Sequence, residues 1–122
     1  MAGQLTIDTL KASSGVLATQ NGMTGIAKAW VNFGGTNTIA GSFNVSSITY
    51  VSTGTYTVNF TTAMANANYS CLTGGAQFAA FPAAGQSTSS YNYTTTSVKV
   101  VSDWNNGNVH DAVVFSVAIF GA

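Results

Sequence analysis

The sequence predicts an all-β fold, an antiparallel β-sandwich of about seven to eight strands. Apolar and polar residues alternate over short runs, and no run keeps the i, i+3, i+4, i+7 spacing of an amphipathic helix over three turns. β-branched and aromatic residues dominate these runs, and glycine, asparagine and proline separate them. The chain has 122 residues, of which 46% are hydrophobic, so it is long enough for one packed domain.

Residues 55–61 show the clearest alternation, with an apolar side chain at every second position. Residues 39–50 form a second extended region, and 43–51 is expected to pair with 55–62 as a hairpin across Gly54. The other expected strands are 26–33, 69–73, 76–81, 90–102 and 109–120, with a polar loop at 83–90. The run from Asp103 to Asn108 contains Asn-Gly, which predicts a hairpin turn before the last strand.

The last strand, from Ala112 to Phe120, is apolar on both faces. An antiparallel sandwich strand normally exposes one face to water. The second face is therefore covered either by a loop of the same chain or by a neighbouring subunit. The residues expected at a subunit interface are Val113, Phe115, Val117, Ile119 and Phe120.

Charged residues make up only 5% of the chain, three lysines and three aspartates, against about 25% in ordinary domains. Three scattered lysines cannot neutralise the phosphates of a nucleic acid. The closest titratable groups are Asp103, His110 and Asp111, and neighbouring strand residues point to opposite faces. We therefore expect no catalytic residues, no metal site and no cofactor, and an alternative reading as a glycan-cleaving enzyme is disfavoured because paired carboxylates are scarce.

The first 25 residues differ from the rest and read as an arm before a β-domain at 26–122. Alternating Leu5, Ile7 and Leu10 are its candidate attachment residues, and the arm could lie along the sandwich or reach a partner. The N-terminus lacks the basic and apolar regions of a signal peptide, so we expect synthesis in a cytoplasm. The single cysteine, Cys71, excludes an intrachain disulfide and is expected to act as a small buried hydrophobe.

Four motifs in fixed order resemble a block found in bacteriophage tail fibre and fibre-like proteins. They are Ala-Lys-Ala-Trp-Val-Asn-Phe at 27–33, Phe-Asn-Val-Ser-Ser-Ile-Thr at 43–49, Tyr-Thr-Val-Asn-Phe-Thr-Thr-Ala-Met at 56–64 and Ala-Asn-Tyr at 67–69. The lead-in at 5–11 and the last strand at 112–120 are also similar to that family. Residues 76–108 have no counterpart in the resemblance.

The resemblance implies a homotrimeric fibre-type module of a virion, released by lysis, that binds other virion proteins through its N-terminal arm. Its role would be adsorption to a host-cell surface polysaccharide, without membrane insertion. The alternative is a capsid or baseplate decoration protein with purely structural contacts.

Residues 76–108, which have no counterpart in the resemblance, contain aromatic rings and amides that suit the binding of neutral carbohydrate. Rings stack on sugar C–H faces, and amides form hydrogen bonds with sugar hydroxyls. The candidates are Tyr91, Tyr93, Trp104, Asn105, Asn106 and Asn108. The alternative is that Tyr91 and Tyr93 pack in the sandwich and that Trp104 covers one end of it.

Overall fold

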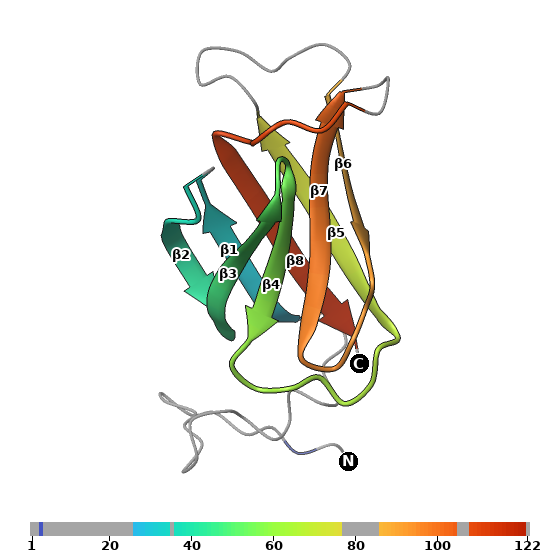
Figure 1. Ribbon diagram of the computed structural model, residues 1–122. Helices are drawn as coiled ribbons and strands as arrows, with labels where there is room; N and C mark the ends of the chain where they lie inside the picture. Colours follow the sequence, from blue (N-terminus) through green and yellow to red (C-terminus); the bar gives the residue numbers. More distant parts are fainter. Residues whose placement is uncertain (1–2, 4–25, 35, 77–85, 105–107, 122) are drawn as a thin grey trace.

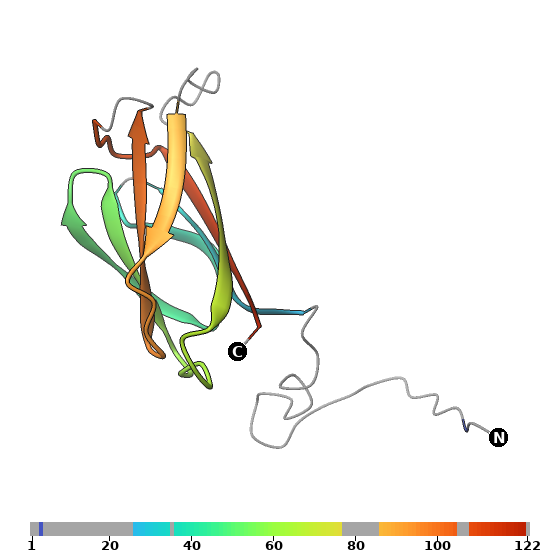
Figure 2. The same ribbon diagram turned by 90° about the vertical axis from the view of Figure 1, so that its right-hand side faces the viewer.

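The computed structural model describes residues 3, 26–34, 36–76, 86–104 and 108–121, and this part of the chain forms eight strands and no helix (Figure 1). The strands are β1 (Ala27–Phe33), β2 (Ile39–Phe43), β3 (Val45–Ser52), β4 (Thr55–Phe60), β5 (Tyr69–Ala76), β6 (Gln86–Tyr91), β7 (Ser97–Trp104) and β8 (Val114–Gly121). All pairings are antiparallel. Sheet A has the order β2-β1-β8-β5 and sheet B the order β3-β4-β7-β6, and Figure 2 shows them as two facing layers. The predicted all-β sandwich is confirmed.

Aromatic rings join the two sheets at the end of the core where β1 ends and β4 and β8 begin. Phe33 of β1 and Phe115 of β8 stack within sheet A, with centroids 5.4 Å apart and planes 7° from parallel. Tyr56 of β4 meets both rings edge-on, at 5.1 Å from Phe33 and 6.0 Å from Phe115. Other fully buried side chains fill the rest of the core: Ala29, Val31, Val58, Val98, Val100 and Ile119.

The extended region predicted at 39–50 is divided by Asn44, which has a φ of 56° and carries the chain from sheet A to sheet B. Its side chain fixes this corner with three hydrogen bonds. The amide nitrogen donates to the carbonyls of Lys28 and Thr62 at 3.1 Å each, and the amide oxygen accepts from the Thr62 N–H at 2.7 Å. Asparagine suits the corner because it tolerates the left-handed region and has both donors and an acceptor.

The single strand predicted at 90–102 is wrong. The chain turns back after Tyr91, through Asn92 at a φ of 53°, so β6 and β7 pair as a hairpin. The Thr94 hydroxyl closes this turn by accepting from the N–H groups of Thr96 at 3.2 Å and Ser97 at 2.9 Å. The predicted loop at 83–90 overlaps β6 for the same reason.

The last two strands do not pair with each other as the hairpin predicted around 103–108 requires, because β7 and β8 belong to different sheets. The connection makes one isolated bridge, between Asp103 and Val109, before it crosses to sheet A. The last strand therefore begins at Val114 instead of residue 109. Residues 105–107 of the predicted turn, and 77–81 of the predicted strand 76–81, lie outside the described residues.

We predict that Asn44→Ala lowers the free energy of unfolding by about 2–4 kcal/mol, because it loses three hydrogen bonds and strains the backbone. Asn44→Gly should lose only about 1–2 kcal/mol, since glycine accepts the positive φ. Urea denaturation measures both values. Asn92→Gly is the control and should change stability by less than about 1 kcal/mol. An Asn44→Gly loss as large as that of Asn44→Ala would contradict the backbone part of this account.

Candidate interaction surfaces

The outer face of sheet A carries an apolar row that crosses all four strands. Cross-strand pairing aligns Phe43 of β2 with Trp30 of β1, Trp30 with Ala118 of β8, and Ala118 with Leu72 of β5. The three large members are well exposed, Phe43 at 39%, Trp30 at 43% and Leu72 at 56%. Scattered surface apolar residues are ordinary, but a continuous row is the signature of a contact surface.

A shallow groove of about 340 Å³ lies in this row between Trp30 and Leu72. A side chain added at Gly41 of β2 would meet the Trp30 ring at 3.5 Å, so the ring leans over that glycine. This leaves open the space above Ala118 and Gly74. Beside it, the Asn32 amide donates to the Ser116 hydroxyl at 2.8 Å, and no residue lining the groove is charged.

The outer face of sheet B is polar. Thr49, Thr57, Lys99 and Tyr91 align across β3, β4, β7 and β6. The Asn59 amide joins neighbouring strands by donating to the Thr49 hydroxyl at 2.9 Å and to the Ser47 hydroxyl at 3.1 Å. The Lys99 ammonium lies 5.9 Å from the centre of the Tyr91 ring. The two outer faces of the sandwich thus differ in chemistry.

The interface residues predicted on the last strand need correction. Phe115, Val117 and Ile119 are at most 3% exposed and face sheet B, so they form core. Both faces of this strand are apolar, and periodicity alone does not tell which face of a strand points inward. The outward residues of β8 are Val114, Ser116, Ala118 and Phe120.

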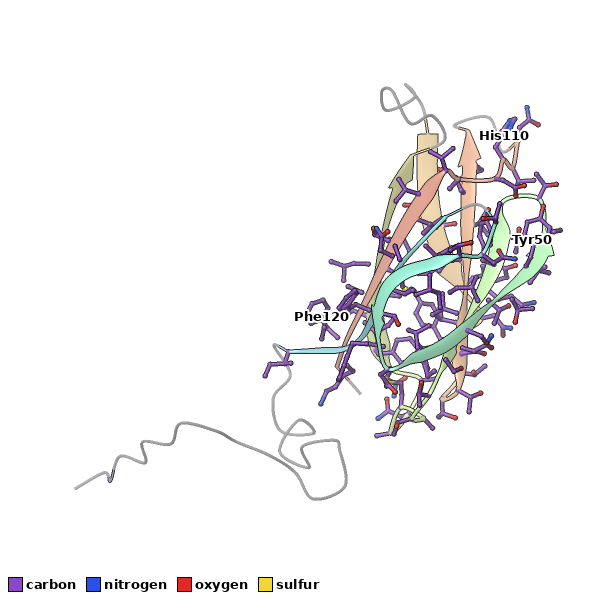
Figure 3. All side chains as sticks on the ribbon, turned by 90° about the vertical axis from the view of Figure 1, so that its left-hand side faces the viewer. Tyr50, His110 and Phe120 are labelled. Atoms are coloured by element: carbon purple, nitrogen blue, oxygen red, sulfur yellow. The ribbon has the colours of Figure 1, made fainter. Side chains whose placement is uncertain are left out.

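Phe120 and Val113, the other two predicted interface residues, lie outside the core. Phe120 is partly exposed, and Figure 3 shows it projecting from β8 on the side away from Tyr50. Val113 is 46% exposed and belongs to the connection before β8.

Asp111 anchors one end of the sandwich. One carboxylate oxygen accepts from the Gly54 N–H at 2.7 Å, the Tyr50 hydroxyl at 3.1 Å and the Tyr56 hydroxyl at 3.3 Å. The β3–β4 turn lies so close to this segment that a side chain at Gly54 would come within 2.7 Å of the His110 carbonyl. The carboxylate therefore ties the β3–β4 turn to the connection that leads into β8, a role that the sequence pattern did not reveal.

His110 and Asp111 lie in this connection and not in a strand, so their predicted placement on opposite faces of a strand is wrong. The His110 N–H donates to the Ser102 carbonyl at 3.1 Å. Within the described residues, no group of three or more His, Cys, Asp or Glu side chains could hold a metal ion.

The six residues proposed for glycan binding do not form one site. Tyr91 pairs with Lys99 near the start of β7, whereas Trp104 ends that strand. Five residues of extended chain separate the two positions, roughly 17 Å. Asn108 belongs with Trp104 at the second end, and Asn105 and Asn106 lie outside the described residues, as does the side chain of Trp104.

Tyr93 lies at the first end, where it packs against Tyr69 of β5 with ring centroids 5.2 Å apart. The Tyr69 hydroxyl donates to the carbonyls of Thr94 at 2.9 Å and Ser97 at 3.1 Å, which fixes the β6–β7 turn. Tyr93 and Tyr91 still expose 37% and 44% of their surface. Their packing therefore leaves each ring partly accessible.

Cys71 faces inward from β5 and packs against the core. Burial raises the pKa of its thiol, which opposes formation of a reactive thiolate. No helix in the described part of the chain is long and apolar enough to span a bilayer. Leu5, Ile7 and Leu10, the predicted attachment residues, lie outside the described residues.

Comparisons with protein-family models, with curated proteins and with solved structures found no match to this chain.

We predict that Asp111→Ala lowers the free energy of unfolding by about 2–4 kcal/mol, because three donors at one end of the sandwich lose their acceptor. Asp103→Ala is the matched control. Within the described part of the chain its carboxylate accepts from the Ser87 hydroxyl at 2.5 Å, so the loss should stay near 1 kcal/mol. Urea denaturation of both variants tests the difference, and equal losses would refute the anchoring role of Asp111.

Alkaline pH should destabilise the fold through Tyr56. Burial, and secondarily the charge of Asp111, raise the pKa of Tyr56 from 10.0 to about 12. The unfolded chain therefore loses the proton of the Tyr56 hydroxyl at a lower pH than the folded protein does. The contribution of this group to the free energy of unfolding is intact below pH 10 and is lost as pH rises from 10 to 12. The expected decrease in unfolding free energy is up to about 3 kcal/mol. Chemical denaturation at pH 9, 10 and 11 measures this decrease. In Tyr56→Phe the free energy of unfolding should depend less steeply on pH. The same steepness in Tyr56→Phe and wild type would contradict the assignment of the pH effect to Tyr56.

Proposed function

We propose that this chain is a phage virion protein, a short tail fibre or fibre-like module that self-associates as a homotrimer and adsorbs to a host surface. The ordered motifs at 27–33, 43–49, 56–64 and 67–69 support the phage assignment by resemblance. The observation that carries the proposal is the contrast between the apolar outer face of sheet A and the polar outer face of sheet B. One face suits contact within an assembly and the other suits exposure to water.

The position of the two chain ends orients the module. Ala27, at the start of β1, pairs with Phe120, at the end of β8. Residues before 26 therefore join the sandwich at the end that also carries Tyr93, since Tyr93 packs on Tyr69 and Tyr69 pairs with Gly121. If residues 1–25 attach the module to the virion, the opposite end points away from it.

The outward end in this arrangement contains Asp111, Asn108 and the end of β7 at Trp104. Host contact is therefore assigned to the part of the candidate set at 104–108, and not to Tyr91 or Tyr93. Recognition would use neutral hydrogen bonds and ring stacking on a cell-surface polysaccharide.

The proposed role is non-catalytic and needs no cofactor. The Asp111 carboxylate is engaged by Gly54, Tyr50 and Tyr56, and the Asp103 carboxylate by Ser87. These contacts give both aspartates structural partners. The protein would be made in the host cytoplasm and released in virions by lysis.

We predict that the fluorescently labelled full-length protein binds host cells or their extracted polysaccharide. Trp104→Ala should weaken binding at least tenfold, which is about 1.4 kcal/mol, because a stacking ring is lost. Tyr91→Ala, at the attachment end, is the matched control and should bind like wild type. Binding unaffected by Trp104→Ala, or lost equally in both variants, would contradict the orientation.

Immunogold labelling of particles from lysates separates the two virion roles. Label projecting from the tail or baseplate supports a fibre. Even label over the head would support the decoration alternative, with purely structural contacts, and would overturn the adsorption role. Absence of label on every particle would overturn the virion assignment itself.

A further inference from the structure

We infer that a second copy of this chain covers the outer face of sheet A, and that Leu72 of one copy enters the groove beside Trp30 of the next. The inference rests on the self-association in the proposed function and assigns it to particular residues. The sequence predicts an interface that includes Phe115, Val117 and Ile119, but these three residues are buried in the core.

Leu72 is the projecting element of this contact. It is 56% exposed, more than any other large hydrophobic residue in the described part of the chain. It stands at the middle of β5, paired with Ala118, so its exposure does not result from a loose end or a loop. A leucine held on a rigid strand costs little conformational entropy when a partner buries it.

The groove is the receiving element. Its floor is low because Ala118 and Gly74 are small, and the Trp30 ring leans away over Gly41. Its volume of about 340 Å³ exceeds by roughly tenfold the ~30 Å³ share of one water molecule, so a side chain can enter. Leu72 and the groove occupy the same face, which lets identical copies complement each other.

Charge and polarity favour a second copy over a different occupant. The groove has no charged lining residue, so it offers nothing to a charged partner, whereas an identical face needs no charge complementarity. Asn32 and Ser116, polar groups beside the groove, bond each other at 2.8 Å and leave few donors for a sugar. Exposed aromatic residues without charge are typical of interface centres.

The size of the face can be compared with that of known interfaces. Its four strands have five, seven, eight and eight residues, and at a spacing of about 4.8 Å they give a projected area of roughly 440 Å². Side chains that stand off the sheet increase the accessible area above this value. Specific interfaces of standard size bury roughly 800 Å² per partner, with the smaller ones near 600 Å². Phe120 and Val114 extend the apolar surface toward the two ends of β8.

The test measures the mass of the full-length protein by sedimentation equilibrium over a concentration series, for wild type and Leu72→Asp. Wild type should give a multiple of 12.5 kDa, and Leu72→Asp should weaken association at least 100-fold. Leu72→Ala introduces no charge and so cannot disturb the fold in that way. It should weaken association about tenfold. Thr49→Asp, exposed on sheet B, is the matched control and should associate like wild type.

Trp30 fluorescence reports the same face in a Trp104→Phe background. Its emission should shift to longer wavelength when Leu72→Asp separates the copies, while circular dichroism shows that the fold is kept. An oligomer unaffected by both Leu72 variants would overturn this inference and leave the trimer standing. A dimer sensitive to Leu72 would support the inference and contradict the trimer.

If the wild-type protein is a monomer at 100 µM, both this inference and the proposed homotrimer are overturned. If that monomer also changed its Trp30 emission on addition of host polysaccharide, the face would be a glycan site instead.

Discussion

Tyr56 is the residue on which the arrangement of the two sheets depends. Its ring belongs to sheet B but lies edge-on to Phe33 and Phe115 of sheet A, and none of its surface is exposed. Its hydroxyl meets the Asp111 carboxylate at 3.3 Å at the end of the core. One side chain thus fixes the spacing of the sheets by packing and the position of the β8 connection by a hydrogen bond. A phenylalanine could do the first but not the second.

A second tyrosine has the corresponding role at the opposite end. Tyr69 of β5 is 7% exposed and reaches across to sheet B, where its hydroxyl fixes the turn before β7. Burial raises the pKa of Tyr69 to about 12, as it does for Tyr56. Each tyrosine therefore places a polar atom where the core meets a turn, and each turn gains an ordered partner. Because buried tyrosines hold both ends of the sandwich, residues on the outer faces of the two sheets are not needed for this purpose.

Period-two patterning was enough to predict the fold class, because residues such as those of β4 alternate in type. It could not place the breaks at Asn44 and Asn92, where a single positive φ redirects an otherwise extended run. It also could not orient β8, since Phe115 and Phe120 are equally apolar and only the position of sheet B decides which is core. The anchoring by Asp111 was hidden for a related reason: its partners lie 55 or more residues away in sequence.

The scarcity of charge has different consequences on the two faces. On sheet B, hydroxyls and amides of neighbouring strands bond one another, as Asn59 does with Ser47 and Thr49, so water can cover that face although ionic groups are few. On sheet A, the same scarcity leaves Trp30 and Leu72 with no charged neighbour lining the groove to keep other apolar surfaces away. Natural sheets commonly use such charges to prevent association. Their absence around this groove, on the face that also carries the exposed Leu72, is the physical reason to place self-association here.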